Sequence, residues 1–267
     1  MIKRDFRIAL RIAPFVVFVA IAKLIVDYLG WDVVELNALY SALVTAAVFL
    51  IGFLLAGTLT DYKESEKLPT EIAARIETIA DECEILFADK SAPEARACLD
   101  HLQRLAKQIN DWLHGREKVD LALGSLRELN ADFLAFEPLT QPNFIVRLKQ
   151  EQSAIRLLVL RINTIRETSF VGSAYVIAEL TSALLIGSLM FANIPQLGAE
   201  IFLLTMVAFV LAYMIALIKD LDEPFEYDGA KRRGSAEISL TVLVDLEQRI
   251  AERSRTLGDL QARVSAP

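Results

Sequence analysis

Cysteine and histidine are scarce in this sequence, and their scarcity bears on metal binding and on catalysis. The 267 residues include two cysteines and two histidines. Cys83 and Cys98 match no zinc or haem spacing, so we expect two reduced, buried thiols. His101 and His114 are isolated in a polar segment, and we expect them to be solvated or structural. The sequence therefore predicts neither a metal site nor a cofactor.

Enzyme motifs are also missing. The sequence has no glycine-rich phosphate loop and no nucleophile–base arrangement, so we expect that the protein is not an enzyme. The formal net charge of −7 and the pI of about 5.1 argue against the basic surface that nucleic-acid binding requires. The classes of function that remain are transport, sensing and scaffolding.

Long apolar runs are what the sequence has in place of these motifs. Hydrophobic residues make up 54% of the chain and the mean hydropathy is +0.39, values typical of a membrane protein with a sizeable aqueous part. A helix that crosses a bilayer needs about 20 apolar residues. Four spanning helices are predicted, at about 12–29, 36–60, 170–192 and 199–218. They predict an all-α membrane protein.

The chain divides into four predicted parts. Residues 1–60 form a basic amphipathic lead-in and a first membrane hairpin, 61–168 a charged helical domain, 169–219 a second hairpin, and 220–267 a loop and a helix. The two short outer connections contain no Lys or Arg, so the positive-inside rule predicts that both termini and the helical domain are cytoplasmic. We expect a multi-pass protein of a bacterial inner membrane.

The stretch Leu36–Thr60 is uncharged and has two unlike faces when it is wound as a helix. One face carries apolar side chains. The other mixes hydroxyls, small residues and two aromatics one turn apart: Thr45, Phe49, Gly52, Phe53, Ala56 and Thr60. Such a face either packs tightly against other helices or lines a narrow passage.

A passage would need a ring of identical protomers, because four helices of one chain enclose little room. In a ring, Phe49 and Phe53 would form an apolar constriction and Thr45 a ring of hydroxyls. Gly52 and Ala56 would let the helices approach. Lys63 and Lys67 continue the same face at the inner mouth.

Charged residues occur within two of the other spans. Lys23 and Asp27 lie four residues apart near the end of the first span, where they form either a pair that reaches the interface or an ion site at an outer mouth. Glu179 lies inside the third span. It is either an ion or proton site, a helix-to-helix hydrogen bond near Thr181 or Ser182, or a protonated acid.

Several short strings, spread in order over most of the chain, resemble the bestrophin family of ion channels. The string Phe49-Leu50-Ile51-Gly52-Phe53 resembles the family's neck, and Thr60 leads to Leu68-Pro69 with a spacing one residue shorter than in the family. Asn163-Thr164-Ile165-Arg166 resembles a string that precedes the third span. The remaining matches are Pro224-Phe225 and, after it, Ser239-Leu240 with Val244-Asp245. A distant bestrophin-like family of bacterial membrane proteins is an alternative assignment.

The resemblance implies a homopentamer with one axial pore, whose neck is formed by Thr45, Phe49 and Phe53. Animal bestrophins conduct anions and hold calcium in an acidic clasp, whereas bacterial relatives can prefer cations. In this chain the acidic run is broken, and Asp222, Glu223, Glu226 and Asp228 are at most a remnant of it. We therefore expect no calcium gating.

The sequence thus predicts a homo-oligomeric channel that passes monovalent ions through a lipid bilayer. Anions such as chloride are favoured over cations as the permeant ions. The alternative is a membrane-anchored scaffold or sensor whose cytoplasmic helices bind a partner. A transporter coupled to the carboxylate of Glu179 is a third hypothesis.

Overall fold

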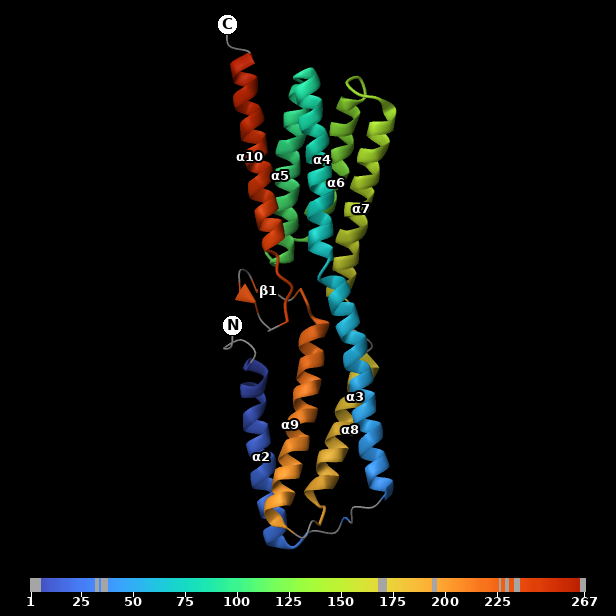
Figure 1. Ribbon diagram of the computed structural model, residues 1–267, viewed down its shortest axis with the longest axis vertical. Coiled ribbons are helices and arrows are strands. Elements are labelled where there is room, and N and C mark those ends of the chain that lie inside the picture. The colour runs from blue at the N-terminus through green and yellow to red at the C-terminus, as the bar shows by residue number, and fades with distance from the viewer. Residues whose placement is uncertain are drawn as a thin grey trace. The chain divides into compact units, whose positions relative to one another are not determined.

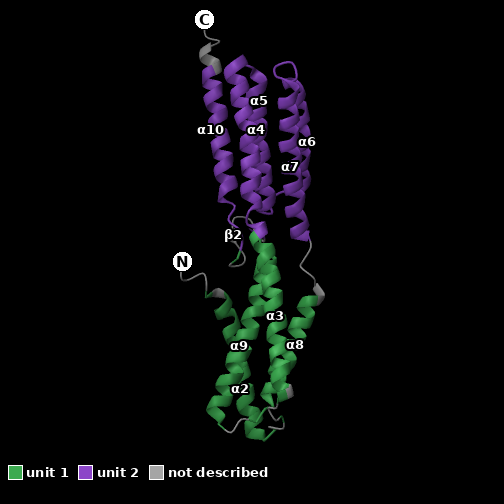
Figure 2. Ribbon diagram, turned by 45° about the vertical axis from the view of Figure 1, so that its right-hand side comes forward, with its two compact units in different colours: residues 1–63, 169–224, 234–236 green, residues 64–168, 225–233, 237–267 purple. Residues whose placement is uncertain are grey.

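The computed structural model describes residues 6–31, 34, 38–167, 172–193, 196–225, 227–228, 231–232 and 236–264. These residues form long helices and two very short strands (Figure 1). The chain falls into two compact units (Figure 2). Unit 1 comprises residues 1–63, 169–224 and 234–236, and unit 2 comprises residues 64–168, 225–233 and 237–267.

Unit 1 is built from α2 (Arg7–Leu29), α8 (Gly172–Met190), α9 (Leu197–Asp222) and the part of α3 (Ala38–Ser65) up to Lys63. Helix α2 packs along α8 and α9, and α8 packs along α9. One apolar core joins the helices through side chains that include Val19, Ile51, Leu185 and Leu204. Because each helix is apolar nearly all round, the rest of its surface suits a hydrocarbon environment.

All four predicted spans are helical in the residues that the structure describes. Three helical stretches are long and apolar enough to cross a membrane: Ile8–Leu29, a part of Tyr40–Lys90, and Leu197–Asp222. The described apolar part of α8, Ala174–Met190, is shorter. Helix α2 begins at Arg7 rather than at residue 12, so the end of the predicted lead-in belongs to the same helix as the span.

Unit 2 contains α4 (Leu68–Lys90), α5 (Pro93–Leu113), α6 (Val119–Phe136), α7 (Pro142–Glu167) and α10 (Thr241–Val264). Helix α4 packs against α5, α7 and α10. Helix α5 also packs against α6 and α10, and α6 packs against α7. The interior of unit 2 is apolar because Ile, Leu, Ala and Phe recur at helical spacing on the facing sides.

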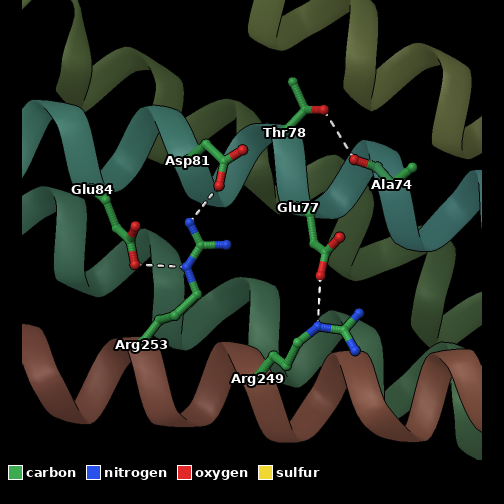
Figure 3. Close-up of polar contacts among 7 residues, drawn as sticks. All are labelled: Ala74, Glu77, Thr78, Asp81, Glu84, Arg249 and Arg253. Carbon is green, nitrogen blue, oxygen red and sulfur yellow. Dashed lines mark hydrogen bonds and ion pairs between the residues drawn. The ribbon is translucent and has the colours of Figure 1, made fainter.

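Helix α10 joins the bundle through an apolar seam and a row of ion pairs. Leu243, Leu246 and Ile250 are fully buried. Beside them, Arg249 Nε donates to Glu77 Oε1 at 2.7 Å, and Arg253 bridges Glu84 and Asp81 on α4 (Figure 3). The two carboxylates raise the pKa of the Arg253 guanidinium above its ordinary value, chiefly through the hydrogen bond to Glu84.

The two strands are β1 (Tyr227–Asp228) and β2 (Lys231–Arg232). They pair antiparallel, with Tyr227 opposite Arg232 and Asp228 opposite Lys231. Residues 68–167, which were expected to be all-α, are helices and turns throughout. The strands lie in the segment after α9, where the sequence predicted a loop.

Candidate functional site

One side of α3 packs within unit 1. Ala47, Ile51 and Leu54 are buried in the apolar core that α2, α8 and α9 also form. The hydroxyl of Tyr40 and Ser188 Oγ are hydrogen-bonded at 3.1 Å, which links the start of α3 to α8. At about 100° per residue these side chains fall in one sector of the helix. This sector is the side by which α3 is held.

The opposite sector of α3 is uncovered in the single chain. It contains the residues predicted from the sequence to line a passage, and each of them is exposed: Thr45, Phe49, Phe53, Ala56, Thr60 and Lys63. The side chains of Phe49 and Phe53 are 74% and 68% exposed. Aromatic side chains carry a large apolar area, so two of them one turn apart favour a surface that is covered in the assembled protein.

The threonines on this sector use their hydroxyl hydrogens within α3. Thr45 Oγ1 donates to Ser41 O at 2.8 Å, and Thr60 Oγ1 donates to Ala56 O at 2.9 Å. The hydroxyl oxygens keep lone pairs that face outward. The sector therefore offers weak acceptors and apolar rings, and its one charge is Lys63.

Gly52 borders the exposed sector, and nothing within the chain requires its small size. A Cβ at this position would meet no atom within 4 Å. Glycine in the middle of a helix costs about 1 kcal/mol relative to alanine.

The two lysines of the predicted inner mouth lie in different units. Lys63 is on α3 in unit 1, and Lys67 follows the end of α3 in unit 2. Both are exposed. The turn at residues 66–67 separates α3 from α4, so the helical face predicted to run through Lys67 ends before it.

Glu179 on α8 forms an ion pair with Lys219 on α9. Its carboxylate is half-exposed, and its ion-pair partner is Lys219 rather than Thr181 or Ser182. An ion pair between two neighbouring helices satisfies the charge of a carboxylate in an apolar segment. The geometry thus gives Glu179 a helix-joining contact that the sequence did not predict.

The pair of Lys23 and Asp27 that the spacing suggested is present, and Lys23 has further partners in unit 1. Its side chain is 0% exposed, and Nζ lies 2.8 Å from Asp27 Oδ1 and 2.7 Å from Glu200 Oε1. It also donates to the carbonyl oxygens of Met190 and Ala192 at 3.2 and 2.9 Å. The ammonium group therefore joins α2, the end of α8 and the first turn of α9. Glu200 is the residue that the sequence did not reveal.

The acidic residues near Pro224 are divided between the two units. Asp222 ends α9 in unit 1, whereas Asp228 lies on β1 in unit 2. Glu223 follows α9, and Glu226 lies outside the described residues. No cluster of three or more His, Cys, Asp or Glu side chains that could hold a metal occurs among the described residues.

A buried serine–histidine–aspartate array occurs in unit 2. His101 Nδ1 lies 2.5 Å from Asp132 Oδ2, and His101 Nε2 lies 3.0 Å from Ser125 Oγ. The array has the order of a hydrolase triad, but Ser125 is only 5% exposed and is buried within the helical bundle of unit 2. A nucleophile must reach a substrate and an oxyanion site. The array is therefore a structural bridge between α5 and α6, and His101 is not solvated.

Cys83 and Cys98 are free and fully buried. A hydrogen bond with Cys83, together with burial, raises the pKa of the Cys98 thiol well above its ordinary value. A protonated, inaccessible thiol is a poor nucleophile and a poor metal ligand. Buried thiols were the expectation from the sequence, and the structure confirms their burial.

Neither protein-family models nor curated proteins match this chain. Solved structures do match over nearly its whole length. One is a variant of a bacterial Bestrophin homolog from Klebsiella pneumoniae, with 11% identity, a TM-score of 0.79, and coverage of 91% of this chain and 99% of the other. A second such variant has 13% identity, a TM-score of 0.73, and coverage of 94% and 99%.

A structure described only as a membrane protein has 12% identity, a TM-score of 0.74, and coverage of 95% of this chain and 99% of the other. The likeness spans both units of the chain in one alignment. From the agreement of the helices and their order, the fold of this chain is that of a bacterial bestrophin homolog.

Proposed function

We propose that the chain is one subunit of a homo-oligomeric, bestrophin-type ion channel in which α3 of every copy faces a central axis. The observation that carries the proposal is the uncovered sector of α3, with Thr45, Phe49 and Phe53 aligned opposite the side that packs in unit 1. The bestrophin-like fold supports it. In a closed ring the exposed phenylalanines of all copies would meet around one axis.

The neck of this channel consists of apolar rings. Phe49 and Phe53 leave a narrow path with no charge, and such a constriction conducts only when water fills it. Thr45 adds a ring of oxygen atoms above the aromatic rings. Gly52 and Ala56 let neighbouring copies of α3 approach closely. Lys63 and Lys67 lie towards the inner mouth.

The proposed assembly has five copies, each with four spans, in a bacterial inner membrane. Both termini and the helices α4 to α7 and α10 are cytoplasmic in this arrangement, because Lys and Arg are missing from the outer connections. The permeant ions are monovalent, and conduction needs no calcium. We propose anion selectivity, with chloride as the test ion, because Lys63 is the first charge below the neck on the same face of α3.

The test is ion flux in proteoliposomes with the wild type and with the variant Phe49→Ala plus Phe53→Ala. Removing both rings widens and wets the neck, so we expect severalfold higher flux. The matched control is Phe18→Ala plus Phe202→Ala, which removes two exposed phenylalanines from α2 and α9 and should leave the flux unchanged.

Absence of flux from all three proteins would leave the scaffold or sensor as the function. Equal flux from all three proteins would contradict the proposal that Phe49 and Phe53 form the neck. A carboxylate-coupled transporter makes a different claim, namely that Glu179→Gln abolishes transport. The ion pair of Glu179 with Lys219 instead favours a structural role for this carboxylate.

A further inference from the structure

Helix α7 carries an uncovered stripe that runs along most of its length. Its buried side chains, which include Leu148, Ile155 and Val159, face the interior of unit 2. The opposite side carries six exposed residues at alternating spacings of four and three: Val146, Gln150, Ser153, Leu157, Leu160 and Thr164. Leu157 is 70% exposed. This is the spacing by which one helix packs along another.

Basic side chains flank the stripe. Arg147 and Arg161 are paired within the chain, with Glu82 at 2.9 Å and Glu64 at 2.7 Å. Lys149 and Arg156 form no ion pair among the described residues. Two such stripes laid face to face would bring like charges together, which is unfavourable. The stripe therefore fits a surface of opposite charge rather than a second α7.

A surface of that kind lies on the other edge of unit 2. Residues of α5 and α10 line an open groove of about 410 Å³: Gln103, Glu247, Gln248, Ala251, Glu252 and Arg255. Two carboxylates and one guanidinium give the groove a net negative charge. Among the exposed neighbours of the groove, Asp245 and Asp259 on α10 add negative charge, and Lys107, one turn after Gln103 on α5, offsets part of it.

The stripe and the groove cannot meet within one chain. Helix α7 packs against α4 and α6, whereas α10 packs against α4 and α5. Both views place α10 at one edge of unit 2 and α7 towards the other (Figures 1 and 2). Two different, complementary surfaces on opposite edges are what a head-to-tail contact between identical subunits requires, and such contacts close into rings.

We propose that the α7 stripe of one copy docks into the α5–α10 groove of the next copy, so that unit 2 contributes to assembly of the ring. The inference rests on the proposed homo-oligomeric channel and names the surfaces by which its subunits meet outside α3. Leu157 and Leu160 supply the apolar contact, and Ala251 and the carbon chains of the groove residues receive it. Lys149 and Arg156 meet Glu247 and Glu252.

Cysteine crosslinking tests the contact in the assembled, full-length protein. The native Cys83 and Cys98 are fully buried, so introduced surface cysteines react selectively. The double variant Leu157→Cys plus Gln248→Cys, treated with a short bismaleimide, should give a ladder from dimer up to the complete ring. Each single variant should give almost no crosslink. Dimers from Leu157→Cys alone, or no ladder from the double variant, would overturn the proposal.

Charge reversal supplies a second measurement. Lys149→Glu plus Arg156→Glu should lower the assembled fraction about tenfold or more by native mass spectrometry. Adding Glu247→Lys plus Glu252→Lys should restore assembly. The matched control is Lys118→Glu plus Arg127→Glu, which makes the same charge change at exposed positions away from both surfaces.

The outcomes separate this contact from the channel itself. If the wild type forms rings and conducts while the ladder and the charge rescue both fail, the docking is wrong and the channel stands. If the wild type neither assembles nor conducts, the channel proposal fails together with the docking.

Discussion

The buried ammonium group of Lys23 is the most constrained charge among the described residues. Its environment holds two carboxylates, Asp27 and Glu200, and two carbonyl oxygens at the end of α8. Cations are favoured at the carboxyl end of a helix, and an anion such as Glu200 is favoured in the first turn. The positive charge of Lys23 and the negative charge of Glu200 thus each lie at the helix end whose dipole favours that charge.

We predict that Lys23→Met strongly destabilises unit 1. The substitution leaves two buried carboxylates without their cation, and breaking a buried ion pair costs roughly 3–5 kcal/mol. Thermal unfolding of the full-length protein in detergent measures the loss. Adding Asp27→Asn and Glu200→Gln should recover part of it.

The matched control is Arg161→Met, which breaks the exposed pair with Glu64 in unit 2. An exposed pair contributes at most about 1 kcal/mol. Equal effects of the two substitutions would contradict the role given to Lys23.

Local sequence could predict only part of this cluster. The spacing of Lys23 and Asp27 already suggested a pair, because residues four apart lie on one helix face. Glu200 follows the second outer connection and looks like an ordinary interfacial acid in the sequence. Its partner comes from a helix far away in the chain, so only tertiary packing reveals the contact. The same holds for Ser125, His101 and Asp132.

At the scale of elements, α10 has two kinds of contact with its neighbours. The apolar seam of Leu246 and Ile250 is fully buried, whereas Arg249 and Arg253 form partly exposed ion pairs with α4 (Figure 3). Burial of an aliphatic side chain stabilises more than an exposed ion pair does. The seam should therefore dominate the docking of α10.

We predict that Ile250→Ala costs about 2–5 kcal/mol of unfolding free energy, while Arg249→Ala plus Arg253→Ala costs about 1–2 kcal/mol. Urea unfolding of the full-length protein measures both, and added salt should shrink only the arginine effect. Arg255→Ala is the control, because among the described residues Arg255 Nε donates to the carbonyl oxygen of Ala251 in the same helix and forms no ion pair with α4. A larger loss from the arginines than from Ile250→Ala would contradict this ranking.

The elements themselves were largely predictable, and their partners were not. Uncharged apolar runs and helical periodicity predicted the helices of both units, because each signal is local. The unlike faces of Leu36–Thr60 distinguished the two sectors of α3, but the sequence left open whether the second sector packs against helices or lines a passage. The stripe on α7 was not recognised, since exposed Leu157 and Leu160 look like core residues in a sequence. The two strands are too short to produce an alternation.

For the whole molecule, the net negative charge of the chain and the positive charge of Lys63 have opposite effects on ion selectivity. The chain has a formal net charge of −7, which attracts cations to its aqueous surface. Lys63 acts locally, because charges further than about 8–10 Å from an ion are screened at physiological salt. The nearest charge to the neck should therefore decide which ions pass.

We predict that Lys63→Glu shifts the reversal potential in planar bilayers towards the cation side. Lys63→Gln should give an intermediate value, since it removes the charge without reversing it. Lys118→Glu, an exposed substitution in unit 2, is the control for net charge. A shift of equal size in the control would mean that net charge, and not the inner mouth, sets selectivity.

The partners of Lys23 also set an order of events during synthesis. Ala192, whose carbonyl accepts from Lys23, lies 169 residues further along the chain. At a synthesis rate of roughly 5–20 residues per second, about 10–30 s pass between the synthesis of Lys23 and that of Ala192. Of the two carboxylates that pair with Lys23 in the described residues, Asp27 is the one already synthesised during that time. The packing of α2 is thus coupled in time to the arrival of α8 and α9.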